Sequence, residues 1–180
     1  MKFNFRIGFY FLMIIMFLAS CKSSYMARQK NRNNERKEDK TSNIKPSSSE
    51  NLNIDVLINR AKKQLGVKYR SGGTEPSSGF DCSGFTKYVF APYDIKLGSN
   101  STQQSAQGID ISKSKAIGGD LIFFNGAKEG SGSVGHVGII IENTNNEIKF
   151  IHASSSKGIM ISSLNEKYFA NRFVKIKRVR

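Results

Sequence analysis

Apolar residues recur at helical spacing directly after residue 53, and at the alternating spacing of strands in the second half of the chain. The first pattern predicts a helix that Asn53 caps and Gly66 stops. The apolar face of this helix consists of Ile54, Leu57, Ile58, Ala61 and Leu65. A short helix over residues 101–107, closed by Gly108, is also predicted.

A second long helix is predicted over residues 81–90, after a loop rich in glycine, serine and proline over residues 69–80. Asp81 is suited to cap this helix, because its side chain accepts hydrogen bonds from the free N–H groups of the first turn. Phe85 and Val89 then face the core together with Cys82.

From residue 120 onward the pattern changes to strands that are rich in β-branched and aromatic residues. The predicted strands cover residues 120–124, 134–141, 147–153, 158–161 and 172–179. Helices first and antiparallel strands afterwards predict an α+β domain, not a doubly wound sheet. In the last strand basic residues alternate with apolar ones, which predicts a solvated basic face.

The N-terminal residues have the pattern of an export signal. A head with Lys2 and Arg6 precedes an apolar run over residues 7–18, which is shorter than the roughly twenty residues that a membrane-spanning helix needs. The sequence LASC over residues 18–21 resembles the lipobox of bacterial lipoproteins, which implies cleavage before Cys21 and diacylation of its thiol. The alternative is an ordinary signal peptide in which Cys21 stands by chance.

Three parts of the chain are therefore expected. Residues 1–20 form a lipoprotein signal peptide, and residues 21–50 comprise the lipidated Cys21 and a disordered polar tether with too few apolar residues to fold. Residues 51–180 form the folded domain. The mature protein is expected to be exported and anchored to a membrane, facing the periplasm or cell wall, with the outer membrane as its location in a Gram-negative cell.

Composition alone selects no partner. The 28 Lys and Arg residues against 14 Asp and Glu give a net charge of +14, which suits nucleic acid, an anionic membrane or another polyanion. Nucleic acid is disfavoured, because the chain carries an export signal and no nucleic-acid-binding motif accompanies the charge. With Cys21 lipidated, the folded domain retains one thiol and cannot form an internal disulfide.

Cys82, His136 and His152 stand out by residue type, because the chain has no other histidine and the folded domain no other cysteine. A thiol becomes a useful nucleophile when its pKa falls towards ambient pH, and a helix N-terminus and a neighbouring imidazole both lower this pKa. Cys82 stands at a predicted helix start. We therefore expect a lowered pKa for this thiol.

The two histidines lie on successive predicted strands. If the hairpin between them folds about Thr144, His136 and His152 are directly opposed and share one face of the sheet. A centre shifted by half a residue would misalign them, and only a bulge would restore the common face. On the symmetric register, one imidazole serves Cys82 as a base and the other orients it, which makes a nucleophile–base–orienter triad.

Two other interpretations of these residues are open. Cys82 can be a small buried apolar residue with each histidine a hydrogen-bonded strand residue. The same three side chains can also be zinc ligands, although no pair among them has the spacing of a zinc motif. The triad interpretation needs no cofactor, and none is expected.

Four blocks resemble the signature blocks of the NlpC family, the papain-like cysteine peptidases of bacterial cell walls. They read GFDCSGF over residues 79–85, GDLIFF over 119–124, GHVGI over 135–139 and FIHA over 150–153. The resemblance covers residues 54–179. It implies a papain-like α+β fold, with N-terminal helices on an antiparallel sheet and the nucleophilic cysteine at a helix N-terminus.

The resemblance also implies a role for individual residues. Cys82 is implied as the nucleophile, His136 as the general base and His152 as the third polar member. Tyr69 is implied as a hydroxyl donor near the oxyanion.

The implied substrate is a peptidoglycan stem peptide, cleaved at the bond between γ-D-glutamate and the diamino acid. Asp81 and Ser83 match positions that hold the free amine of that peptide. Ser99 stands where many members have arginine, which changes the expected substrate contacts of that segment. A monomer is expected, and two other functions stay open on the same fold: a non-catalytic wall-binding lipoprotein and a thiol acyltransferase.

Overall fold

The computed structural model describes residues 53–126, 128–144 and 147–180, so the predicted signal peptide, Cys21 and the tether lie outside the described residues. Asn53 caps α2 (Ile54–Lys62), as predicted: its side-chain oxygen accepts hydrogen bonds from the backbone N–H groups of Asp55 and Val56 at 3.1 and 3.2 Å. The helix ends at Lys62, and turns carry the chain on to Gly66, so the predicted helix was one turn too long.

The remaining helices are short, except for the one that carries the cysteine. They are α3 (Cys82–Phe90), α4 (Ser101–Ser105), α5 (Lys167–Arg172) and the 3-10 turns η1 (Ala91–Tyr93) and η2 (Lys113–Lys115). The sequence pattern missed α5 and assigned its last residue to the final strand. No helix in the described residues has the length and apolar character that a membrane span needs.

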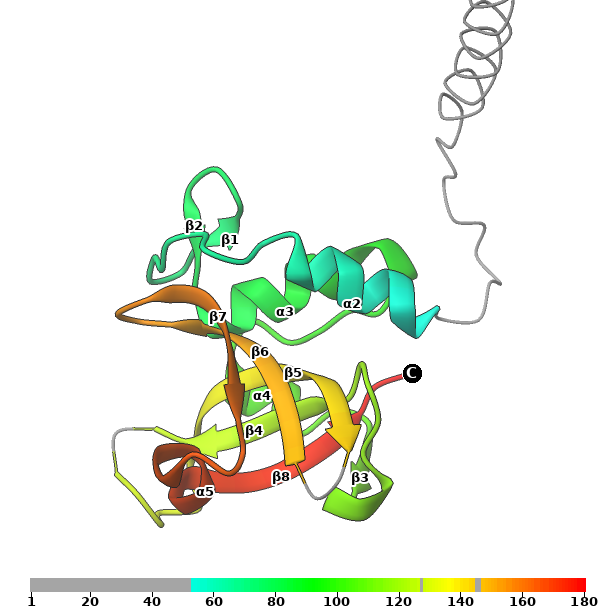
Figure 1. Ribbon diagram of the computed structural model, residues 1–180. Coiled ribbons are helices and arrows are strands. Elements are labelled where there is room, and N and C mark those ends of the chain that lie inside the picture. Colours follow the sequence, from blue (N-terminus) through cyan, green and yellow to red (C-terminus); the bar gives the residue numbers. More distant parts are fainter. Residues whose placement is uncertain (1–52, 127, 145–146) are drawn as a thin grey trace, which may run out of the picture. The chain divides into compact units, whose positions relative to one another are not determined.

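Six strands in the described part of the chain form one antiparallel sheet in the order β3-β8-β4-β5-β6-β7, and two more form a small hairpin. The strands are β1 (Thr74–Glu75), β2 (Gly79–Phe80), β3 (Ile109–Ile111), β4 (Leu121–Asn125), β5 (Val134–Thr144), β6 (Glu147–Ser154), β7 (Gly158–Ser163) and β8 (Phe173–Arg178). Figure 1 shows α2 and α3 on one side of the curved sheet and α5 on the other. The predicted α+β fold is confirmed.

Alternate residues of the central strands supply two apolar cores, as the period of a strand requires. Phe123, Val137 and Ile151 face the helices and pack with buried residues of α2 and α3. Phe124 and Phe150 face the other way and pack with Phe169 of α5. The histidine positions of β5 and β6 alternate with Val137 and Ile151, so both histidines belong to the side of the sheet that α5 covers.

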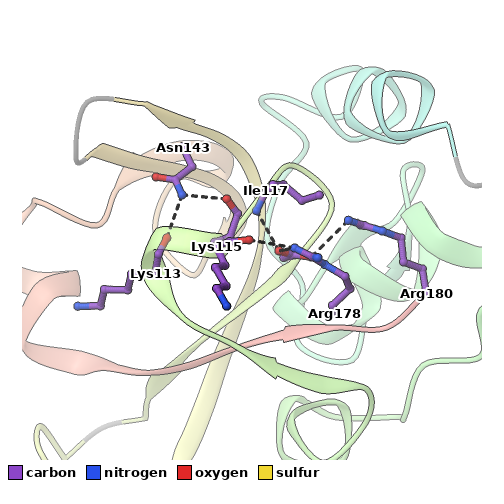
Figure 2. Close-up of polar contacts among 8 residues, drawn as sticks. Lys113, Lys115, Ile117, Asn143, Arg178 and Arg180 are labelled. Atoms are coloured by element: carbon purple, nitrogen blue, oxygen red, sulfur yellow. Dashed lines mark hydrogen bonds and ion pairs between the residues drawn. The ribbon is translucent and has the colours of Figure 1, made fainter.

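The basic residues at the end of the chain do not form the solvated face that their alternation predicts. Arg178 donates two hydrogen bonds of 2.8 Å to the fully buried carboxylate of Asp120, and Arg180 approaches the same carboxylate at 3.7 Å (Figure 2). The backbone N–H of Ile117 donates to it at 3.0 Å. Lys177, only 8% exposed, pairs with Asp110 at 3.0 Å. The prediction failed because β8 is an interior strand whose neighbours supply acidic partners.

Candidate active site

The N-terminus of α3 presents Cys82. As predicted, Cys82 begins the helix and Asp81 is its N-cap. One carboxylate oxygen of Asp81 accepts hydrogen bonds from the backbone N–H of Gly84 at 2.6 Å and the hydroxyl of Ser83 at 2.9 Å. The other oxygen accepts from the backbone N–H of Gly72 at 2.9 Å. The carboxylate thus ties the preceding loop to the first turn of the helix and fixes the position of the half-buried Cys82.

The hairpin between β5 and β6 has a different register from the symmetric one. At its tip Thr144 pairs with Glu147, which shifts the centre of the hairpin by one and a half residues from the predicted position. A bulge between Ile140 and Glu142 then shifts the register once more. The first shift alone would send the two histidines to opposite faces, so the bulge is what restores their common face.

His152 pairs across the strands with Gly138, so it lies diagonal to His136 and is not directly opposed to it. Gly138 is required at this point: a Cβ there would lie 2.8 Å from a ring carbon of Phe150 and 3.3 Å from Cβ of His152. The missing side chain leaves room for the two imidazole rings. Diagonal neighbours on one face remain within reach of such long side chains.

The two rings are in direct contact. Nε2 of His136 lies 2.9 Å from Nδ1 of His152, with the rings nearly perpendicular at 88°. The other nitrogen of His152, Nε2, lies 3.3 Å from the hydroxyl oxygen of Ser162. The rings of Phe150 and Phe169 each lie 5.2 Å from the His152 ring and shield it from water.

Four of the six predicted site residues line one pocket of about 620 Å³: Tyr69, Cys82, His136 and His152. The structure therefore brings the predicted nucleophile, base, third member and hydroxyl donor to one cavity. Asp81 and Ser83 are not among the residues that line it, because their side chains are turned into the cap of α3.

The pKa of Cys82 moves in the direction opposite to the sequence expectation. Burial is the largest cause and raises the pKa of this thiol, and the carboxylate of Asp81 raises it further. The backbone N–H of Val137 on β5 lowers it, and so do those of Ser83 and Cys82 at the helix N-terminus, but together they do not outweigh burial. The prediction was wrong because it counted the local helix end and omitted the loss of water around the sulfur.

The imidazoles are shifted towards the neutral form. Burial lowers the pKa of His136 to about 4, and burial followed by the charge of His136 lowers the pKa of His152 to about 3. Tyr69 is 37% exposed, and its pKa is raised by burial first and then by the nearby Cys82 and Asp81. Near neutral pH the site therefore contains a thiol, two neutral imidazoles and a protonated phenol.

Sequence reasoning missed the part of the pocket that β7 and α5 supply. Ser162 was left outside a predicted strand that ended two residues too early, although β7 continues through it and pairs it with Phe150. Arg172, at the end of α5, pairs with Glu129 at 3.0 Å and lies 4.0 Å over the ring of Tyr168. A longer strand over residues 158–163 would have placed Ser162 on the same face as the histidines.

The zinc interpretation finds no ligand set. In residues 53–126, 128–144 and 147–180, no group of three or more His, Cys, Asp or Glu side chains is placed to hold a metal ion. Instead, the two histidines use one nitrogen each on their mutual contact.

Two helices, α2 and α3, on one side of an antiparallel sheet, with a cysteine at a helix N-terminus and a histidine pair on adjacent strands, define a papain-like fold. The model of the NlpC/P60 family matches residues 66–178. The chain belongs to this family, as its four sequence blocks indicate.

The chain is similar to proteins that are named as endopeptidases. The chain is 32% identical over 174 residues to the murein DD-endopeptidase MepS/murein LD-carboxypeptidase of Escherichia coli K12, covering 92% of this chain and 88% of that protein. It is 43% identical over 128 residues to the probable endopeptidase NlpC of the same organism, covering 70% of this chain and 78% of that one.

Solved structures agree with the fold. A crystal structure of an NlpC/P60 family protein from Bacillus cereus has a TM-score of 0.64 and 32% sequence identity, covering 74% of this chain and 41% of that one. The NlpC/P60 domain of the peptidoglycan hydrolase SagA has a TM-score of 0.58 and 32% identity, covering 71% of this chain and 100% of that domain.

Proposed function

We propose that this chain is a peptidoglycan hydrolase, a cysteine endopeptidase that cleaves the bond between γ-D-glutamate and the diamino acid of murein stem peptides. The observation that carries the proposal is the 2.9 Å contact between His136 and His152 in the pocket that Cys82 also lines. Membership of the NlpC/P60 family and the murein endopeptidases among the relatives support it.

The reaction begins from neutral groups. Because burial raises the pKa of Cys82 and lowers that of His136 to about 4, the resting pair is thiol and imidazole. The sulfur attacks the γ-carbonyl carbon while Nδ1 of His136 takes the thiol proton. His136 is then protonated on both ring nitrogens. Its Nε2–H donates a hydrogen bond to Nδ1 of His152, and this bond holds the imidazolium in place.

The carbonyl oxygen becomes an oxyanion beside the N-terminus of α3, where the partial positive charge of the helix end stabilises it. Tyr69 lines the same pocket, and its raised pKa keeps the phenol protonated as a further donor. When the intermediate collapses, the C–N bond breaks and His136 gives its proton to the leaving amine. Water, deprotonated by His136, then hydrolyses the thioester and returns the thiol of Cys82.

Asp81 and Ser83 are proposed to contribute to recognition of the free amine of the stem peptide. Their hydrogen bonds within the cap leave the Asp81 carboxylate a fixed negative charge next to Cys82. A fixed carboxylate at this distance from the nucleophile attracts an ammonium group without having to reorient.

A second bond specificity is supported by one relative. The protein that matches 92% of this chain is named a DD-endopeptidase, which acts between two D-configured residues. The γ-D-glutamyl bond instead joins a D residue to an L centre. Defined muropeptides that contain only one of the two bonds distinguish these activities.

The site is proposed to operate outside the cytoplasm, on a lipid anchor at Cys21. Cell-wall peptidoglycan is the substrate named for the relatives, and the lipobox-like sequence before Cys21 supports the anchor. Two acyl chains suffice for stable membrane attachment.

The experiment compares full-length wild type with two cysteine variants in detergent. Mass spectrometry of digested muropeptides identifies the bond, and Cys82→Ala is expected to abolish release. Cys21→Ser is the matched control: it removes a cysteine outside the site, so it should retain cleavage but leave the membrane fraction. Unchanged release by Cys82→Ala contradicts the mechanism, and membrane-bound Cys21→Ser contradicts the anchor. Murein binding without cleavage by wild type contradicts the enzyme and favours a wall-binding protein.

A further inference from the structure

The imidazole contact of the proposed triad continues to a fourth side chain. Nε2 of His152 lies 3.3 Å from the hydroxyl oxygen of Ser162, which stands on β7. Both side chains are almost completely shielded from solvent, with His152 at 3% and Ser162 at 4% exposure. Water therefore cannot easily replace the hydroxyl as the partner of this nitrogen.

When both rings are neutral and hydrogen-bonded to each other, their protons can be arranged in only two ways. One proton lies between Nε2 of His136 and Nδ1 of His152, which are 2.9 Å apart. If His136 holds it, Nδ1 of His136 is free to accept the thiol proton and His152 carries its own proton on Nε2. If His152 holds it, Nδ1 of His136 is already protonated and cannot act as the base.

Only the first arrangement requires a hydrogen-bond acceptor at Nε2 of His152. The nearest rings on that side of the pair, Phe150 and Phe169, are apolar. The hydroxyl of Ser162 can accept a hydrogen bond from this N–H in the first arrangement or donate one to the bare nitrogen in the second. An unpaired buried N–H is more unfavourable than an unpaired acceptor nitrogen, so loss of the hydroxyl shifts the tautomers towards the arrangement in which His136 is blocked.

We propose that Ser162 is a positioning residue of the triad, which holds His152 in the Nε2–H tautomer and thereby keeps His136 available as the base. The proposal rests on the hydrolase function proposed above. Ser162 acts through His152 and takes no part in bond making. The proton transfers of the proposed reaction are the same with or without this contact, because the hydroxyl accepts a hydrogen bond and transfers no proton.

Two substitutions of equal shape test the role of the hydroxyl. Ser162→Thr keeps the hydroxyl, whereas Ser162→Val replaces it with a methyl group, and the two new side chains have the same shape, so any effect of the added branch is common to both. Ser162→Val and Ser162→Ala are expected to lower kcat about tenfold with KM unchanged, in line with the loss of one hydrogen bond. Ser162→Thr should stay near wild type. Ser163→Ala, the neighbouring position on the opposite face of β7, should not change kcat.

Variants made in a His152→Ala background distinguish a positioning role of Ser162 from a general loss of activity. If Ser162 acts through His152, Ser162→Val should have no additional effect on kcat once His152 is replaced by alanine. Equal kcat for the Val and Thr variants, or an additional tenfold loss in the His152→Ala background, would overturn the proposal.

A measurement without substrate keeps this inference separate from the proposed function. Nitrogen-15 shifts of the imidazoles report which nitrogen of His152 carries the proton. Wild type and Ser162→Thr should show the proton on Nε2, and Ser162→Val a shift towards Nδ1. The same tautomer in all three would overturn the inference, even if muropeptides are cleaved. Lack of cleavage by wild type with the expected tautomers would instead overturn only the proposed function.

Discussion

Replacing Asp81 with asparagine should destabilise the domain and, at the same time, make the Cys82 thiol more acidic. Asparagine retains an oxygen for the N–H of Gly84 and the hydroxyl of Ser83, but it places an NH₂ group against the N–H of Gly72. The charge-assisted bond to Gly72 and the carboxylate at the helix N-terminus are both lost. Because Gly72 is exposed and water can replace its partner, we expect a loss of about 1–2 kcal/mol in the free energy of unfolding.

The same substitution should lower the pKa of the Cys82 thiol. After burial, the carboxylate of Asp81 is the next cause that raises the pKa of Cys82, so its removal lowers that pKa. The rate of alkylation by iodoacetamide, followed against pH, reports the thiolate fraction directly. The midpoint for Asp81→Asn should lie below that of wild type, while urea unfolding shows the reduced stability.

Asp94→Asn is the matched control, because it removes the same charge beyond the other end of α3. Its backbone has a positive φ of 56°, which asparagine tolerates as well as aspartate does. This control should change neither the alkylation midpoint nor the cap. A midpoint for Asp81→Asn that equals or exceeds the wild-type value would refute the assignment of Asp81 as a cause of the raised thiol pKa.

Four further predictions concern the pair of imidazoles and the buried carboxylate. Burial lowers the pKa of His136 from 6.5 to about 4, so the acid limb of kcat/KM against pH should lie near 4. Because the unfolded imidazole takes up its proton near 6.5 and the folded one only near 4, the free energy of unfolding in urea should fall as the pH is lowered from about 6.5 to about 4. Asp120→Asn should lower the free energy of unfolding in urea by about 3 kcal/mol, because it leaves Arg178 opposite a neutral group, with kcat unchanged where the domain is folded. Gly138→Ala should reduce kcat up to about 10²-fold, because its Cβ would lie 3.3 Å from that of His152 and displace the ring, whereas unchanged kcat would contradict the crowding.

The elements that follow from local rules were predictable from the sequence. Asn53 and Asp81 cap α2 and α3 through their own side chains, and a cap is a property of a few consecutive residues. The short α5 carries no comparable signal: its N-cap, Glu166, makes no side-chain capping bond, and the helix spans six residues. Its position depends on Phe169, which packs into the core beneath the sheet, and this contact is tertiary.

The candidate triad shows the same division between local and tertiary information. Residue type and spacing were enough to select Cys82, His136 and His152, and to require a bulge if the hairpin centre were shifted. They were not enough to fix the register, because the polar sequence ENTNNE over residues 142–147 is compatible with several hairpin centres. The diagonal arrangement follows from the bulge near Ile140, which brings Gly138 opposite His152.

The thiol pKa is the clearest failure of local reasoning, and it changes the account of the site. A helix N-terminus and an imidazole suggested a thiolate, but the burial of Cys82 outweighs the backbone N–H groups around it. In the proposed mechanism the charged pair therefore forms only during attack, when the substrate fills the pocket and the oxyanion develops next to the helix N-terminus. A resting thiol with a raised pKa is also a poor target for oxidants, since the thiolate is the form that they attack. In the exported setting proposed above, the burial that makes Cys82 less nucleophilic at rest protects the single thiol of the folded domain until a stem peptide is bound.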